Sequence, residues 1–306
     1  MMGACEMLLL EDIAYRLMKK GWSALRAVKI AFITSILLHV AVTLAIWASF
    51  ILMYPVILVP LLYLFIISIT LCLSIALGLY VMLPSVALFF ARPLNVAELG
   101  LLNILNSVME KVRGLKRVQL LIRDKGGPNA YSVSNVFKRA IILSKSICTI
   151  LSEEELKAVM GHEIGHFSRL DRALLFTRFL VICTGIFNIA LATFLIASLL
   201  HLNITLAIVM SIIMFVPAVT IDLSLSRLRE HYADMCAVKV SSSEALASAL
   251  RKMEMAWRSG GEKNKLLISL LLPILRALRT HPLSSDRIYV AKHYHQELLY
   301  ENAQIA

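Results

Sequence analysis

The sequence predicts an α-helical membrane protein with four transmembrane helices and a cytoplasmic α+β domain. Hydrophobic residues make up 59% of the 306 residues and charged residues only 17%, against roughly 45–50% and about 25% in ordinary soluble domains. The apolar residues gather in four runs. No lysine or arginine occurs between Lys29 and Arg92, or between Arg178 and Arg227.

The order of polar and apolar stretches predicts five segments. They are an N-terminal lead (1–29), a first transmembrane hairpin (30–83, with runs at 30–54 and 55–83), the first part of the cytoplasmic domain (84–173), a second hairpin (174–222, with runs at about 176–200 and 204–221) and the second part of the domain (223–306). The lead is amphipathic and basic, and we expect it to form a helix on the membrane surface. His39 stands alone in an apolar run, so we expect a packed or interfacial residue rather than a ligand.

Both hairpins have short turns. The residue before a proline avoids the helical region, so Tyr54 and Pro55 mark the first turn, and residues 201–203 mark the second. A buried soluble hairpin is the alternative for the second pair, because its last run has only 18 residues and contains Pro217. The turns lack lysine and arginine, so the positive-inside rule places both termini and the intervening polar segment in the cytoplasm. The five widely spaced cysteines form no CxxC pair, which indicates reduced thiols.

The polar segment 84–173 contains the main chemical motif. The runs RVQLLIRD and RAIILSKSI are predicted strands, and the turn between them passes into another extended stretch. A helix follows, with Ser152 as N-cap and Glu155 at capping-box spacing. This helix carries HEIGH. Four residues advance a helix by about 400°, so His162 and His166 share one face and can bind one ion, while Glu163 lies beside it.

A catalytic metal on this motif needs one more protein ligand. Glu230 lies just after the second hairpin, which returns the chain to where it left. Asp234 lies on the same helix face and could accept a hydrogen bond from the far nitrogen of either histidine. A helix break at 168–171 would bring Glu230 level with the histidines. His231 points elsewhere, and we expect a structural role for it.

At these residues the sequence resembles the HtpX-type membrane zinc metalloproteases, relatives of the CAAX prenyl proteases. The motifs that carry the resemblance are HEIGH, EHYAD, NAYS and THPLSSDRI, and they contribute His162, Glu163, His166, Glu230, Asp234, Asn129, Ala130, His281 and Arg287. The resemblance implies a gluzincin-like (zincin) domain, one zinc ion and cleavage of membrane or misfolded proteins. It also implies that the strand at Asn129 and Ala130 lines the substrate cleft, where an exposed edge can pair with an extended peptide.

The expected reaction is zinc-dependent endopeptidase cleavage, in a role in membrane protein quality control. Glu163 is the expected general base. His281 or Arg287 is a candidate to stabilise the oxyanion, and Arg287 is equally a candidate for a structural ion pair. The alternatives are a CAAX-type prenyl protease and a non-enzymatic membrane scaffold or transporter. The formal net charge is +11, and the basic residues flank the membrane segments. We therefore expect the lipid bilayer as partner and no nucleic acid.

Overall fold

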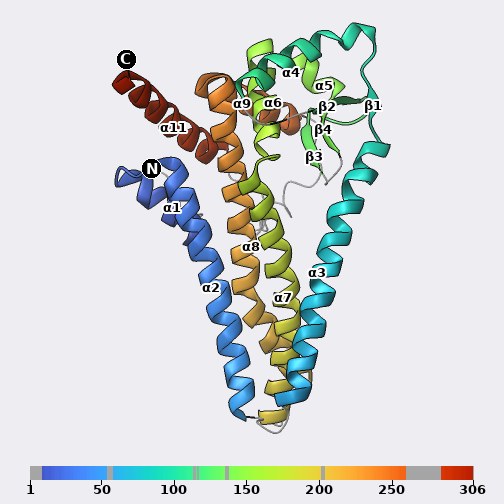
Figure 1. The fold of residues 1–306 in the computed structure, drawn as a ribbon, viewed down its shortest axis with the longest axis vertical. Coiled ribbons are helices and arrows are strands. Elements are labelled where there is room, and N and C mark those ends of the chain that lie inside the picture. The colour runs from blue at the N-terminus through green and yellow to red at the C-terminus, as the bar shows by residue number, and fades with distance from the viewer. Residues whose placement is uncertain are drawn as a thin grey trace.

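Four long helices run side by side, and a small sheet with shorter helices covers one end of them (Figure 1). The computed structural model describes residues 9–53, 58–112, 115, 117–134, 138–200, 204–259 and 284–305. The long helices are α2 (Ala24–Met53), α3 (Leu58–Phe89), α7 (Arg169–Leu200) and α8 (Ile204–Val240). The predicted turns at 54–55 and 201–203 lie outside the described residues.

Two of the long helices contain stretches that are long and apolar enough to cross a membrane. Among the described residues these are Ala24–Ala45 in α2 and Arg169–Ile189 in α7. α8 continues without a break from the fourth apolar run through Glu230. One end of this helix is therefore apolar, and the other end, which carries the polar residues, packs against α6 at the end of the molecule where the sheet lies (Figure 1).

Polar contacts tie the long helices together. His39 Nε2 in α2 lies 2.7 Å from Thr184 Oγ1 in α7, which agrees with the packed role predicted for this histidine. Arg178 in α7 donates two hydrogen bonds, of 2.8 and 3.0 Å, to Asp222 in α8. These contacts fix α7 against its neighbours, and α7 begins next to the HEIGH motif.

The N-terminal helix α1 (Leu9–Lys19) packs on protein rather than presenting its apolar face to a membrane surface. Its residues Ala14, Tyr15 and Met18 are buried in a cluster with α2, α8 and α11 (Ser284–Ile305). The Tyr15 hydroxyl also donates to the Asp286 carbonyl at 3.0 Å. The sequence shows that this helix is amphipathic but not which surface covers its apolar face, and here protein covers it.

The sheet has four strands in the order β1-β2-β4-β3. They are β1 (Arg92–Pro93), β2 (Gln119–Arg123), β3 (Ala130–Ser134) and β4 (Arg139–Ser144). β2 pairs parallel with β4, while β3 pairs antiparallel with β4 and forms an edge. The predicted strands are therefore present, but the last run is shorter than expected. It ends at Ser144, whose side chain accepts a hydrogen bond from the Ile147 amide and starts α5 (Lys145–Ile150).

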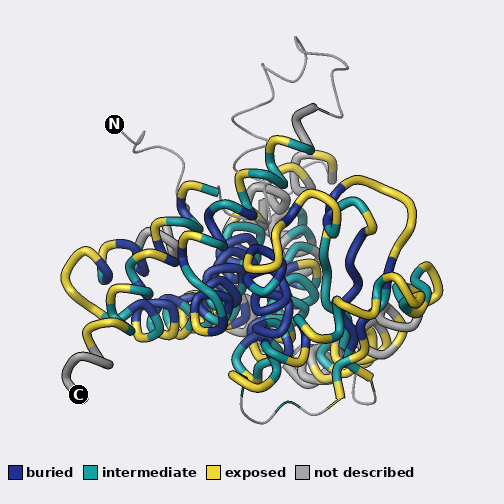
Figure 2. The backbone as a smooth tube through the Cα atoms, turned by 90° about the horizontal axis from the view of Figure 1, so that it is seen from above, coloured by how far each residue is buried: buried dark blue, intermediate teal, exposed yellow. Residues whose placement is uncertain are grey.

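The sheet and the shorter helices enclose α6 (Glu153–Gly165), which carries the HEIGH motif. One side of α6 packs in a buried cluster with the sheet, α4 (Gly100–Lys111) and α9 (Ser243–Ser259), and it also contacts α8. Seen from above, the buried residues gather in the middle of the molecule and the exposed ones form its rim (Figure 2). Ten of the thirteen residues of α6 are buried, so this helix is a rigid support for a site.

Candidate metal centre

The start of the motif helix is as the sequence predicts, and its end lies close to the predicted break. The Ser152 side chain accepts from the Glu155 amide, and Glu155 Oε2 accepts from the Ser152 amide at 2.7 Å, which completes a capping box. The helix ends at Gly165, with His166 as its C-cap, and α7 begins at Arg169. A break between the motif and the third long helix is therefore present, but it lies at 166–168 rather than at the predicted 168–171, because α7 already begins at Arg169.

Two glycines let α6 approach α8 closely. A Cβ atom on Gly165 would lie 2.8 Å from Ala233 Cα and 3.0 Å from Cys236 Cβ. A Cβ atom on Gly161 would collide with the Val240 side chain. Because any larger residue would push the two helices apart, these glycines set the distance across which Glu230 reaches the histidines.

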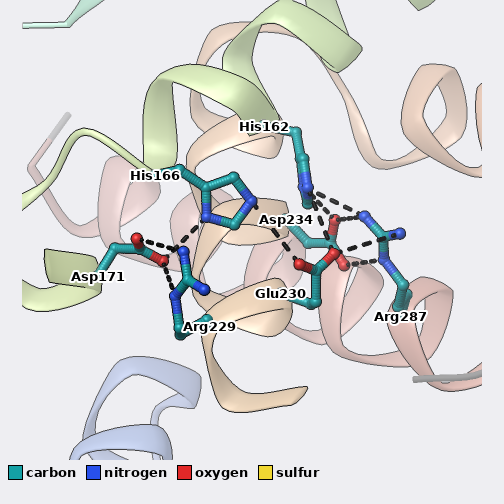
Figure 3. Close-up of polar contacts among 7 residues, drawn as sticks. All are labelled: His162, His166, Asp171, Arg229, Glu230, Asp234 and Arg287. Carbon is teal, nitrogen blue, oxygen red and sulfur yellow. Dashed lines mark hydrogen bonds and ion pairs between the residues drawn. The ribbon is translucent and has the colours of Figure 1, made fainter. Parts of the chain in front are cut away.

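His162, His166 and Glu230 lie close enough together to hold a metal ion, and we call this group the metal cluster (Figure 3). One ligand atom from each residue lies within 4.8 Å of the other two. His162 Nε2 is 3.5 Å from Glu230 Oε2, and His166 Nε2 is 3.8 Å from Glu230 Oε1. The three donor atoms therefore face one common point.

Each histidine contacts a different aspartate through its Nδ1 atom, while its Nε2 atom faces Glu230. His162 Nδ1 lies 2.9 Å from Asp234 Oδ1, and His166 Nδ1 lies 2.9 Å from Asp171 Oδ1 (Figure 3). A carboxylate can only accept, so both Nδ1 atoms donate and both Nε2 atoms are left for a metal. Asp234 was predicted from the sequence, whereas Asp171 was not. Its signal was an acidic residue at the end of the predicted break, five residues beyond His166.

Two arginines hold these aspartates. Arg229 donates to both oxygens of Asp171, at 3.0 and 2.9 Å. Arg287 from α11 donates to both oxygens of Asp234, at 2.8 and 2.6 Å, and its Nη1 is 3.7 Å from Glu230 Oε2. The predicted ion pair of Arg287 is therefore present. His281, the other predicted residue of this segment, lies outside the described residues.

The buried charges shift each other's pKa. Burial and the charge of Arg287 would lower the pKa of His162, but hydrogen bonds to Asp234 and Glu230 outweigh them and raise it to about 10. Burial would raise the pKa of Asp234, but Arg287 and His162 lower it to about 2. The carboxylates around His162 therefore favour its protonated form, and binding of a metal ion at this ring would require the proton to leave.

A cavity of about 460 Å³ opens in front of the metal cluster. Buried Glu163 lines it beside the two histidines, and Asn129 and Ala130 line it from the β3 edge. The Asn129 backbone is fixed by bonds to Ser144, with N to Oγ at 2.9 Å and O to N at 2.8 Å. The structure thus brings together every predicted site residue that it describes.

These features place the protein in a class: it is a helical protein with candidate membrane spans and a candidate metal site built on an HExxH motif, as in metallopeptidases. Residues 101–295 match the model of peptidase family M48, and they are more than half of the chain. The chain therefore belongs to peptidase family M48, whose members are metallopeptidases.

Curated relatives carry protease names, and one solved structure has a similar fold. The chain is 29% identical over 163 residues to a protease HtpX homolog of Archaeoglobus fulgidus, covering 50% of this chain and 46% of that protein. It is 34% identical over 177 residues to a protease HtpX homolog of Thermoplasma volcanium, covering 56% of each. The matches span about half the length of these relatives. The fold is similar to that of S. mikatae Ste24p, with a TM-score of 0.51 at 19% identity, covering 86% of this chain and 66% of that one.

Proposed function

We propose that this protein is a membrane-bound, zinc-dependent endopeptidase. The observation that carries the proposal is the metal cluster itself: two histidines and a glutamate converge, and an aspartate holds the far nitrogen of each histidine. An incidental histidine pair would not need two separate buried carboxylates. The family match supports the same chemistry.

Zinc fits this donor set. Catalytic zinc sites use three nitrogen or oxygen ligands and leave a position open, and the cluster offers two imidazole nitrogens and one carboxylate beside a cavity. When bound there, zinc would supply Lewis-acid polarisation of a carbonyl and activation of a water molecule. Asp234 and Asp171 would keep both imidazole rings oriented and in the required tautomer.

The remaining roles follow from position. Glu163 lines the cavity next to both histidines, so we assign it the proton transfer from water to the leaving amine. Arg287 also lines the cavity while paired with Asp234. Its guanidinium can orient Glu230 and contribute positive charge near a developing oxyanion. His281 stays a candidate for the same task from the resemblance alone.

The substrate would bind as an extended peptide along β3. Among the described strands, β3 pairs only with β4, and its other edge lies at the cavity. Backbone pairing on a free edge gives affinity for many sequences, which suits unfolded or membrane-embedded proteins. Asn129 and Ala130 would make the first contacts. A role in membrane protein quality control is consistent with such broad recognition.

We further propose four membrane spans, with the metal cluster and both termini on the cytoplasmic side. Four long helices run together, and α1 and α11 lie at the same end as the sheet (Figure 1). α3 contains no charged residue in its 32 positions. The basic residues outside the spans favour the cytoplasm for this end.

Metal content and casein digestion by the purified full chain test the proposal. We expect about one zinc ion per chain, loss of digestion with a chelator and recovery when zinc is returned. A chain that digests casein equally well with and without bound metal would contradict it. A farnesylated CAAX peptide as the alternative substrate distinguishes a prenyl protease, which would cleave this peptide and leave casein intact.

A further inference from the structure

A second cavity, of about 690 Å³, lies on another face of the motif helix. Among the described residues, none lines both this cavity and the cavity at the metal cluster. α4, the start of β4, the end of α6, the turn into α7 and the polar part of α8 surround it. We call it the basic pocket. Five of its lining residues are cationic: Lys111, Arg139, Arg169, Arg172 and Lys239.

The basic pocket has an unbalanced charge. None of its described lining residues is an aspartate or glutamate. Lys111 Nζ donates to the Val240 carbonyl at 2.7 Å, and Lys239 lies over the Tyr294 ring. Within the described part of the chain, no hydrogen bond or ion pair engages the side chains of Arg139, Arg169 or Arg172. Three guanidinium groups around one cavity are therefore available to an anion from outside.

The chemistry of the lining favours a phosphate group attached to an apolar body. Guanidinium groups bind phosphate through paired hydrogen bonds. Val112, Leu115, Ile164 and Phe167 line the same cavity, and they would contact carbon rather than water. A free inorganic anion would use the arginines but leave these apolar side chains unmatched.

The location favours a lipid. The candidate span Arg169–Ile189 starts at the pocket, so Arg169 and Arg172 stand where a span leaves the hydrocarbon and headgroups begin. Figure 1 shows α7 continuing from this point alongside α8. Basic pockets at the cytoplasmic end of membrane helices are suited to anionic headgroups.

We propose that the basic pocket binds the phosphate of an anionic phospholipid, with Arg139, Arg169 and Arg172 as its ligands. The described lining of the pocket contains no residue of the metal cluster, so we expect binding to be independent of proteolysis.

The test is binding of dioctanoyl phosphatidylglycerol to the purified full chain in detergent micelles. Binding is detected as a rise in the thermal unfolding midpoint. The comparison probes are dioctanoyl phosphatidylcholine and inorganic phosphate. We expect phosphatidylglycerol to raise the midpoint with saturation, and the other two probes to have little effect. An equal response to inorganic phosphate would overturn the assignment to a lipid, and an equal response to phosphatidylcholine would overturn the role of the anion.

A triple variant tests the pocket itself. Arg139→Gln/Arg169→Gln/Arg172→Gln should weaken phosphatidylglycerol binding on the order of 100-fold, because each basic residue near a headgroup contributes roughly fivefold. The charge-matched control is Lys19→Gln/Arg26→Gln/Arg251→Gln, which changes three exposed residues outside the pocket. Equal weakening by the control would show a diffuse charge effect and overturn the proposal.

The single variants Arg139→Gln and Arg172→Gln guard against misfolding of the triple variant. Each should unfold like the unmodified chain without lipid and lose about fivefold in affinity. Unchanged affinity in both would also contradict the proposal.

Discussion

On one face of α6, His162 and His166 contact carboxylates that are themselves paired with arginines. On another face, three arginines line the basic pocket, and none of them contacts a carboxylate among the described residues. The first set is buried, so its charges have to compensate one another inside the protein. The second set is not deeply buried, so water can solvate its charges. Paired charges therefore hold the buried metal cluster together. The three arginines at the basic pocket, which have no partner among the described residues, lie where solvent or a ligand can reach them.

The largest expected effect comes from Glu163, which lines the cavity at the metal cluster but is not one of the proposed metal ligands. Glu163→Gln should lower casein digestion by about 10²–10⁴-fold while zinc content stays the same, because an amide cannot take a proton from water. Initial rates and metal analysis on the same sample measure both. Glu110→Gln, at an exposed position of α4, is the control and should keep its activity. Full activity in Glu163→Gln would remove this residue from the mechanism.

Breaking one support of the metal cluster should weaken metal binding. Asp171→Asn should lower zinc affinity by about 10–100-fold, because His166 loses the carboxylate that orients its ring. Competition with a chromogenic chelator measures the affinity. Asp124→Asn is the matched control, since Asp124 is also paired with an arginine, Arg92, but is remote from the histidines. If both variants bind zinc as the unmodified chain does, Asp171 is not a positioning residue.

The close approach of α6 and α8 can be broken without changing any charge. Gly165→Ala should destabilise the fold by about 1–3 kcal/mol, because the new methyl group overlaps Ala233. Urea unfolding in micelles measures the change. Gly100→Ala places the same methyl group where no atom lies within 4 Å, and it should cost nothing. Equal stability of the two variants would contradict a packing role for Gly165.

Glu155, in the first turn of α6, should stabilise the fold to an extent that depends on pH. Burial alone would raise the pKa of Glu155, but hydrogen bonds from Lys252, Ser248 and the Ser152 amide outweigh it and lower the pKa to about 2. The stabilisation is therefore fully present above the ordinary value of 4.5 and is lost as pH falls toward 2.

Thermal midpoints measured from pH 6 down to pH 3 should show this loss. Glu155→Gln should unfold more easily at pH 6 and show a weaker decline toward pH 3. An identical decline in both proteins would assign the acid sensitivity to other groups.

The smallest expected effect comes from an arginine of the basic pocket, compared with an arginine that supports the metal cluster. Arg172→Gln should change the free energy of unfolding by no more than about 0.5 kcal/mol, because its side chain engages no described partner. Arg229→Gln, which removes the two hydrogen bonds from Arg229 to buried Asp171, should destabilise clearly more. Equal losses measured by urea unfolding would mean that the two faces do not differ in charge pairing.

The amino-acid sequence by itself determined the local features of the site. The capping box, the shared face of His162 and His166 and the break before α7 depend on neighbouring residues and on helix geometry, and all three are present. Glu230 could also be predicted, because a hairpin has to return the chain near its starting point. The strands could be predicted for the same local reasons.

Only the tertiary structure decided which distant groups meet. It gave His166 its partner Asp171, closed Arg287 onto Asp234, buried the apolar face of α1 against protein and let α8 approach through Gly161 and Gly165. It also gathered the basic pocket from four separate segments. The physical reason is that periodicity and capping act over a few residues, whereas these contacts depend on how whole helices pack.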